Sequence, residues 1–206
     1  MKRRLKKAHK EAVLEIYQFL KDGRFYLAGG TAVYYYINHR ISEDLDFFTS
    51  EKIDFRQCRE LFRKNEIFEL TEDTIHCKVK GIKVSFFYYP YDLLRDKFSF
   101  DLIELASLED ILAMKASAII QRGSKKDFTD VYFIMKELNI NSEKVIELFR
   151  QKYGNFNPLI LRKAFVYFED ADSEPDLRML KPVKWDEIKD FFIEKFVEEW
   201  GWERSG

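Results

Sequence analysis

The sequence has few of the residues that mark secreted, fibrous or disordered chains. Its 206 residues include eight glycines, four prolines and two cysteines, Cys58 and Cys77, and neither cysteine lies in a CxxC or Cys/His pattern. This scarcity excludes a disulfide framework, a zinc site of ordinary spacing and a low-complexity chain. We expect both thiols to be buried.

Long hydrophobic runs are also missing. The first ten residues, MKRRLKKAHK, are basic, and the stretch that follows is amphipathic and charged rather than continuously apolar. A secretory signal needs an apolar stretch behind its basic start, and a membrane span needs about 20 apolar residues. We therefore expect a cytoplasmic protein that does not enter a membrane.

Apolar and aromatic side chains are abundant. Hydrophobic residues make up 46% of the chain, with 20 Phe and 11 Tyr, which predicts a real core at this length. The net charge of -1 hides an asymmetry, because six Lys or Arg lie in the first ten residues while residues 186–199 are mostly acidic and aromatic. The basic start either contacts RNA or another polyanion, or is a solvated helical end that only aids solubility.

Residues 1–106 have the pattern of a mixed α/β region. Apolar positions recur at helical spacing in residues 8–21, RFYLAGG predicts a short buried strand that ends at a glycine pair, and DLDFFT predicts another strand. The other predicted elements are helices at TAVYYYINH and DFRQCRELFRKN and strands at IFELTED, TIHCKVKG and IKVSFFYY, the last two joined in a hairpin at Lys80–Gly81.

Residues 107–206 have a helical pattern. The stretches 107–123, 124–139 and 141–154 open with Ser or Asn and close with Gly or Asn, residues favoured at the two ends of helices. EDADSEPD is expected to be an exposed loop before a last amphipathic helix that ends near Trp200. The predicted fold class is α/β (α+β), a mixed sheet flanked by helices in residues 1–106 and a helical region in residues 107–206.

Gly29, Gly30 and Thr31 stand where the first predicted strand turns into a helix. Backbone N–H groups point outward at a helix start, and the helix dipole adds positive potential there. Glycine leaves room for a phosphate oxygen against the backbone, and the Thr31 hydroxyl can cap the helix or donate to the anion. The pattern indicates a phosphate site or, as the plainer alternative, a structural turn.

Asp44 and Asp46 are two apart on the next predicted strand, so both side chains face the same way, about 6.6 Å apart along the chain. Leu45 and Phe47 face the opposite side. Carboxylate oxygens are ligands that Mg²⁺ prefers, and a pair of bound ions can activate an attacking oxygen and stabilise a leaving pyrophosphate. The alternative is a strand whose outward face is simply acidic.

The Gly-Gly pair followed by Asp-x-Asp on a strand resembles the signature of the nucleotidyltransferase superfamily of DNA polymerase β type. More closely, LAGGTAVYYYINHRISEDLDFFT resembles the AbiEii/AbiGii toxin family of nucleotidyltransferases, with His39, Arg40 and Ser42 before the Asp-Leu-Asp. A second block, SLEDILAMKASAIIQRGSKKDFTDVYFI, is similar to later motifs of that family. It holds Lys115 and Arg122, then Asp127 and Asp130, and the resemblance spans about residues 24–137.

The second block also has a physical logic of its own. Lys115 and Arg122 are seven apart on one predicted helix and share a face, as do Asp127 and Asp130 on the next. The Lys is a point charge and the Arg a fork, both suited to phosphate oxygens. One of the two aspartates could orient Lys115 or act as base toward an acceptor hydroxyl. The alternative is a set of helix–helix salt bridges.

The resemblance implies a Mg²⁺-dependent nucleotidyltransferase that moves a nucleoside monophosphate from an NTP to an acceptor hydroxyl, with tRNA a candidate acceptor. It implies a toxin with a neighbouring antitoxin protein, and a helical region, 107–206, that closes over the nucleotide cleft. In this interpretation the catalytic residues are Asp44, Asp46, Lys115, Asp127 and Asp130, the metal ligands are Asp44 and Asp46, and the nucleotide-binding residues are Gly29, Gly30, Thr31, Arg40, Ser42 and Arg122.

One position departs from the superfamily pattern. A third carboxylate is expected on a neighbouring strand, and the segment GIKVSFFYYP has Ser85 there. Asp92, Asp127 and Asp130 are candidates to supply the acid instead. This departure motivates one alternative function, a nucleotide-binding protein with lost or weak transfer activity. A second alternative is a nucleotidyltransferase that modifies a small molecule, as related antibiotic nucleotidyltransferases do.

Overall fold

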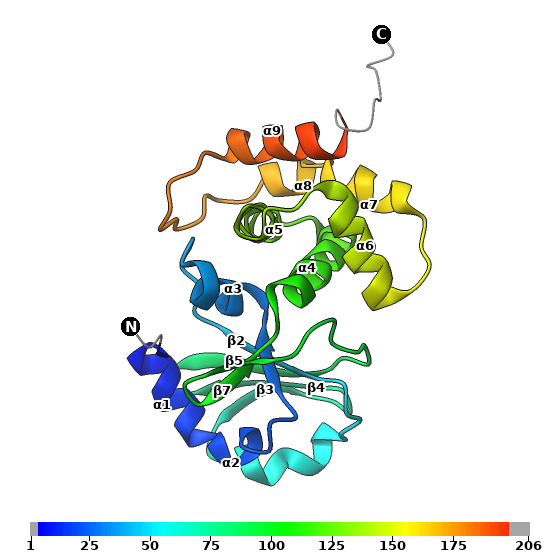
Figure 1. The fold of residues 1–206 in the computed structure, drawn as a ribbon. Helices are drawn as coiled ribbons and strands as arrows, with labels where there is room; N and C mark the ends of the chain where they lie inside the picture. Colours follow the sequence, from blue (N-terminus) through cyan, green and yellow to red (C-terminus); the bar gives the residue numbers. More distant parts are fainter. Residues whose placement is uncertain (1–3, 198–206) are drawn as a thin grey trace. The chain divides into compact units, whose positions relative to one another are not determined.

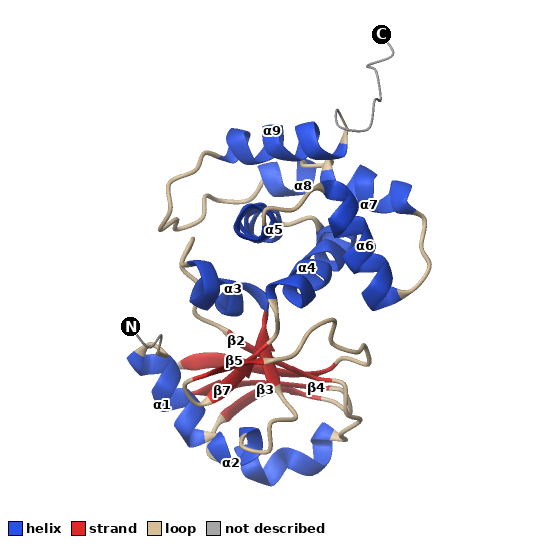
Figure 2. Cartoon of the chain, in the orientation of Figure 1, coloured by secondary structure: helices blue, strands red, loops and turns tan. Residues whose placement is uncertain are grey.

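The computed structural model describes residues 4–197, drawn in Figures 1 and 2. Of these, the residues in Met1–Tyr35 and Ser42–Ser107 form one compact unit, here called the sheet unit. Those in Tyr36–Ile41 and Leu108–Gly206 form a second, the helical unit. The predicted α/β class is confirmed, and a short segment that interrupts the sheet unit in sequence belongs to the helical unit.

Within the described residues, the sheet unit contains one mixed sheet of seven strands in the order β3-β4-β5-β2-β1-β7-β6. The central strand β2 runs antiparallel to β1 and parallel to β5. Leu45 and Phe47 on β2 are buried on one face, as their alternation with Asp46 predicts. The strands are β1 (Tyr26–Ala28), β2 (Leu45–Thr49), β3 (Glu66–Leu70), β4 (Thr74–Val79), β5 (Ile82–Tyr88), β6 (Phe98–Phe100) and β7 (Ile103–Leu105).

Short helices cover one face of the sheet (Figure 1), and the contacts of Phe86 place its ring on that face. The Phe86 ring lies 5.1 Å from that of Phe19 and 5.5 Å from that of Phe62, edge to face in both pairs. The helix predicted over residues 8–21 is interrupted at Ile16, where φ is -109° and ψ is 13°. The covering helices are α1 (Lys7–Glu15), α2 (Tyr17–Leu20) and η1 (Phe55–Phe62), and η1 is a 3₁₀ helix rather than an α-helix.

The helical unit is built around helices whose ends match the sequence signals. The side chain of Asn141 accepts a hydrogen bond from the backbone N–H of Lys144 at 3.0 Å, and Asn139 ends the preceding helix in the left-handed conformation. Phe128 is fully buried against Phe165 and Phe192. The helices are α4 (Leu108–Arg122), α5 (Lys125–Leu138), α6 (Ser142–Tyr153), α7 (Pro158–Phe165), α8 (Glu169–Asp172) and α9 (Trp185–Phe196).

Several expectations need correction. Residues 169–176 are not wholly an exposed loop, because Glu169–Asp172 forms α8 and buries Ala171. Strands β6 and β7 and helix α7 were not predicted from the sequence. Cys77 is buried, but Cys58 is only half-buried. The predicted end of the last helix near Trp200 lies outside the described residues. No helix within residues 4–197 is long and apolar enough to cross a membrane.

Candidate functional site

The sheet unit places a bare backbone at the end of β1. The chain leaves the buried strand at Ala28, and Gly29 adopts a φ of +67°, a conformation that side chains other than glycine rarely adopt. Helix α3 (Gly29–Ile37) begins at this residue, two positions earlier than the sequence pattern predicts. The first N–H groups of a helix have no intrahelical partner, so the glycine pair sits where an anion is best accommodated.

Asp46 lies beside this helix start. In the pairing of β1 with β2 it is opposite Ala28, and a Cβ atom added to Gly29 would come within 3.2 Å of its Oδ2 atom. The carboxylate therefore lies against the space that a side chain on Gly29 would fill. Asp46 is half-buried, whereas Asp44, which immediately precedes β2, is exposed.

Asp44, just before β2, and Asp46, within it, are the two carboxylates of this region that could hold a cation. Among the described residues, no group of three or more His, Cys, Asp or Glu side chains is arranged to hold a metal ion. Two carboxylates without further protein ligands fit Mg²⁺, which retains water and is held by one or two carboxylates together with substrate phosphates. They do not fit a transition metal that needs several protein nitrogen or sulfur ligands.

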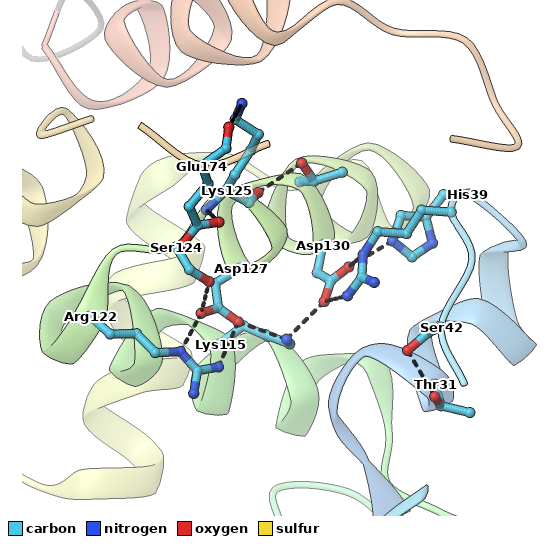
Figure 3. A network of polar contacts seen from close by, with 12 residues as sticks. Thr31, His39, Ser42, Lys115, Arg122, Ser124, Lys125, Asp127, Asp130 and Glu174 are labelled. Atoms are coloured by element: carbon cyan, nitrogen blue, oxygen red, sulfur yellow. Dashed lines mark hydrogen bonds and ion pairs between the residues drawn. The ribbon is translucent and has the colours of Figure 1, made fainter. Parts of the chain in front are cut away.

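Two further predicted residues meet near this helix start. The Thr31 hydroxyl donates a hydrogen bond to Ser42 Oγ at 2.8 Å (Figure 3), and Thr31 is 2% exposed. The contact ties the first turn of α3 to the segment that leads into β2. Ser85 on β5 lies directly opposite Asp46 on β2. The β5 side chain next to Asp46 is therefore a hydroxyl-bearing serine and not an acid.

The helical unit gathers the other predicted residues around Asp130 on α5, which is fully buried (Figure 3). Arg40 grips this carboxylate with two nitrogens, Nε at 2.6 Å and Nη2 at 2.8 Å. His39 Nε2 lies 2.7 Å from Oδ1, and Lys115 Nζ lies 2.8 Å from Oδ2. Asp130 thus joins Lys115 on α4 to Arg40 and His39, which lie about 90 residues away in the sequence.

Asp127, one turn earlier on α5, completes the cluster (Figure 3). It accepts hydrogen bonds from Lys115 Nζ at 2.7 Å, Arg122 Nε at 2.8 Å and Ser124 Oγ at 2.8 Å. Lys115 and Arg122 reach the same carboxylate because both lie on one face of α4. The salt bridges of the plainer interpretation are therefore present, and Lys115, only 6% exposed, is shared between the two aspartates.

Mutual pairing fixes the charges of this cluster. Burial disfavours ionisation of Asp127, but Lys115 and Arg122 outweigh it and hold the pKa of Asp127 at about 2. Burial opposes the charge of Asp130 as well, and Lys115 and Arg40 hold its pKa well below the usual range. Burial lowers the pKa of His39 despite the nearby carboxylate. At neutral pH the cluster thus holds ionised aspartates and a neutral histidine.

The segment that carries His39 and Arg40 is also held by its backbone. The carbonyl oxygen of His39 accepts from the N–H groups of Leu180 and Lys181, at 2.8 and 2.9 Å, and the N–H of Ile41 donates to the carbonyl oxygen of Arg178 at 2.9 Å. Among the described residues, Nδ1 of His39 has no hydrogen-bond partner. The segment is therefore fixed to the helical unit by main-chain and side-chain contacts together.

The structure places the predicted residues in two separate sets. Gly29, Gly30, Thr31, Ser42, Asp44 and Asp46 belong to the sheet unit, while Arg40, Lys115, Arg122, Asp127 and Asp130 belong to the helical unit. Asp92, the other candidate for a third acid, is exposed in the loop that follows β5. Sequence reasoning missed the pairing of His39 and Arg40 with Asp130 and the contact of Ser124 with Asp127. No local spacing rule connects residues 90 positions apart.

Comparisons with known proteins identify a family. The chain matches the model described as "Nucleotidyl transferase AbiEii toxin, Type IV TA system" over residues 12–104 and 87–204. It is 40% identical over 204 residues to a protein of Aquifex aeolicus (strain VF5), described as uncharacterized, a match that covers 95% of this chain and 98% of the relative.

Two solved structures share the fold along most of the chain. The crystal structure of JHP933 from Helicobacter pylori has a TM-score of 0.52 at 18% identity and covers 95% of this chain and 96% of that one. MenT4, the nucleotidyltransferase toxin Rv2826c from Mycobacterium tuberculosis H37Rv, has a TM-score of 0.51 at 13% identity and covers 94% of this chain and 85% of that one.

Proposed function

Because this chain belongs to the AbiEii family of nucleotidyltransferase toxins, we propose that it transfers a nucleoside monophosphate from an NTP to an acceptor hydroxyl with Mg²⁺ as cofactor. We propose tRNA as the acceptor and a toxin–antitoxin pair in the cytoplasm as the setting, with a neighbouring antitoxin protein as partner. The nucleotidyltransferase activity follows from the family. The metal, the acceptor and the roles of individual residues are the proposal.

The position of Asp46 against the backbone of Gly29 is the observation that carries the proposal. The N–H groups at the start of α3 attract a phosphate, whereas the Asp46 carboxylate repels it. A free anion therefore gains little binding energy from the two groups together. A cation bound to Asp44 and Asp46 would resolve this conflict, because it would neutralise the carboxylates and draw phosphate oxygens toward the glycines. The geometry therefore favours a metal–nucleotide complex over a simple anion.

The reaction can be written with this chain's residues in defined roles. The acceptor oxygen attacks the α-phosphorus, the bond from that phosphorus to the β-phosphate oxygen breaks, and pyrophosphate leaves with the electron pair. Gly29, Gly30 and Thr31 bind the phosphates and orient the α-phosphorus, and the Thr31–Ser42 contact holds the helix start in place. Bound Mg²⁺ would supply charge neutralisation of the attacking and leaving oxygens.

We propose that the cations of the helical-unit cluster compensate the negative charge of the triphosphate. Asp127 and Asp130 keep Lys115 protonated, since their Coulomb attraction outweighs the burial that would lower its pKa. Arg122 remains more than half exposed while it pairs with Asp127, so it is the cation of the cluster best placed to meet a ligand. In this proposal Asp127 positions Arg122, which compensates the leaving pyrophosphate, and Lys115 holds Asp127 and Asp130 together.

The test is transfer of label from each α-phosphate-labelled NTP in turn to total tRNA or to a small-molecule extract, with magnesium. An Asp44→Ala, Asp46→Ala double variant removes the proposed metal ligands, and Glu43→Gln is the matched control because it neutralises an exposed acid next to Asp44. We expect label on tRNA with the wild type and Glu43→Gln and none with the double variant.

Other results assign a different acceptor or reject the mechanism. Label on a small molecule but not on tRNA would show that the acceptor is a small molecule and would reject tRNA. Transfer that persists in the double variant would remove Asp44 and Asp46 from the catalytic set. Binding of NTP without any transfer would favour a nucleotide-binding protein with lost activity, the alternative that Ser85 suggests.

A further inference from the structure

A row of polar side chains crosses the sheet next to Asp46. In the strand pairing, Ser85 on β5 is opposite Asp46 on β2, His76 on β4 is opposite Ser85, and Glu69 on β3 is opposite His76. Directly paired residues point to the same face of a sheet. All four side chains therefore lie on the face opposite to Phe86 and the covering helices.

Contacts connect three members of the row. His76 Nδ1 lies 2.9 Å from Ser85 Oγ, and His76 Nε2 lies 3.6 Å from Glu69 Oε2. In the tautomer with a proton on Nε2, the imidazole accepts a hydrogen bond from Ser85 and turns its N–H toward the carboxylate. An acid, an imidazole and a hydroxyl thus form a chain that ends beside Asp46.

Access along the row varies. Ser85 is 2% exposed, but the His76 side chain is 25% exposed and Asp46 is half-buried, so the residues on both sides of the hydroxyl reach solvent. The next positions along this face hold Lys78 on β4, with Lys83 on β5 and Glu66 on β3 opposite it in the strand pairing, and all three side chains are exposed. The Nδ1 atom of His76 is directed at Ser85.

We propose that Ser85 and His76 form the proton relay that deprotonates the acceptor hydroxyl, an inference that rests on the proposed transfer reaction. As the acceptor oxygen bonds to the α-phosphorus, its proton passes to Ser85 Oγ, and the original Ser85 proton passes to His76 Nδ1. Ser85 ends as a neutral hydroxyl and His76 as an imidazolium. Glu69 positions the ring and compensates its positive charge.

The relay removes a chemical difficulty of the site. A serine hydroxyl is far too weak a base to accept a proton and keep it, and carboxylates that hold a cation are poor bases as well. An imidazole behind the serine provides a nitrogen lone pair that can take up the proton. The Glu–His–Ser order follows the general logic of an acid that orients a base, which in turn serves a hydroxyl.

The experiment measures kcat and the dissociation constant for the nucleotide in variants of the row. We expect His76→Gln and Ser85→Ala each to lower kcat by about 10²-fold, the usual scale of general base catalysis, with nucleotide affinity unchanged. Glu69→Gln lowers kcat less, and Glu66→Gln, an exposed acid on the same strand, is its matched control. Thermal unfolding of each variant confirms that the fold is retained.

Ser85→Asp provides the decisive background, because a carboxylate at this position can accept the acceptor's proton without His76. In Ser85→Asp, adding His76→Gln should leave kcat within about twofold, as expected for groups that no longer interact. An equal loss in both backgrounds would make His76 a structural residue and overturn the relay. So would wild-type kcat in His76→Gln.

The two proposals fail in different ways. Transfer by the wild type that disappears in the Asp44→Ala, Asp46→Ala variant but persists in His76→Gln would retain the transferase and reject the relay. No transfer by the wild type to any acceptor would overturn the proposed function, and the relay with it.

Discussion

The missing side chain of Gly29 and the carboxylate of Asp46 occupy adjoining space. A Cβ atom at Gly29 would lie 3.2 Å from Asp46 Oδ2, which is closer than most real Cβ contacts, so the carboxylate would have to shift by a few tenths of an ångström. Gly29 also has a φ of +67°. Glycine is therefore favoured here for two reasons: the backbone has a positive φ, and the Asp46 carboxylate leaves little room for a side chain.

Gly29→Ala should consequently affect both stability and activity. The positive φ costs an alanine about 1–2 kcal/mol, and the displaced Asp46 carboxylate should lower kcat by roughly tenfold. Gly81→Ala is the matched control, because Gly81 has a φ of +85° but nothing within 4 Å of an added Cβ. It should lose similar stability in urea unfolding and keep its activity; equal activities in the two variants would contradict the prediction.

Asp130→Asn should strongly destabilise the protein. The substitution removes a buried charge that compensates Arg40 and Lys115, and breaking one partner of a buried ion pair costs about 3–5 kcal/mol. Asp176→Asn is the control, since this side chain is 95% exposed and only 3.4 Å from Lys125, where a pair contributes at most about 1 kcal/mol. The free energy of unfolding in urea distinguishes the two, and equal values would show that Asp130 is not a stabilising centre.

Acid should weaken the fold through Asp127. Its pKa is held at about 2 in the native state, against about 3.9 in an unfolded chain. Because the native pKa is the lower one, the contribution is complete above about pH 4 and is lost as the pH falls toward 2. It amounts to about 2–3 kcal/mol. Unfolding free energies from pH 2 to 6 should show a shallower acid limb for Asp127→Asn than for the wild type, and parallel limbs would refute this assignment.

The two thiols should differ in reactivity. Cys77 is fully buried on β4, and burial raises its pKa to about 11, whereas Cys58 is half-buried with a pKa that burial raises too. Since the thiolate is the reactive form, iodoacetamide should label Cys58 first and reach Cys77 only when the protein unfolds. Mass spectrometry of native and urea-treated samples measures the order, with Cys58→Ser as the control that should take up no label when native.

The elements that the sequence predicts well are those with a strong local signal. The hairpin at Lys80–Gly81, the caps at Asn139 and Asn141 and the alternation around Asp46 are all written in neighbouring residues. Strands β6 and β7 have only three residues each and pair with each other, while Leu105 of β7 also pairs with Leu27 in β1. Three residues are too few to show a clear alternation, and the place of β7 in the sheet depends on a partner far along the chain.

The candidate site divides in the same manner. Spacing alone puts Asp44 beside Asp46 and Lys115 on one face with Arg122, and both relationships depend on helix and strand periodicity. The bond between Arg40 and Asp130 and the row from Glu69 to Asp46 are tertiary contacts. The sequence identifies these polar residues as candidates. Their contacts with one another depend on the strand order and on the path of the chain.

The path of the chain also determines how the molecule can be cut. Because segment 36–41 lies between two parts of the sheet unit in sequence yet belongs to the helical unit, neither unit is one continuous stretch of polypeptide. A fragment that starts at Leu108 would leave Asp130 without Arg40, and Arg178 and Leu180 without their backbone partners. Cutting the gene between residues 107 and 108 would therefore give two incomplete fragments. To study the helical unit alone, residues 36–41 have to be joined to it, for example by a circular permutation or a linker.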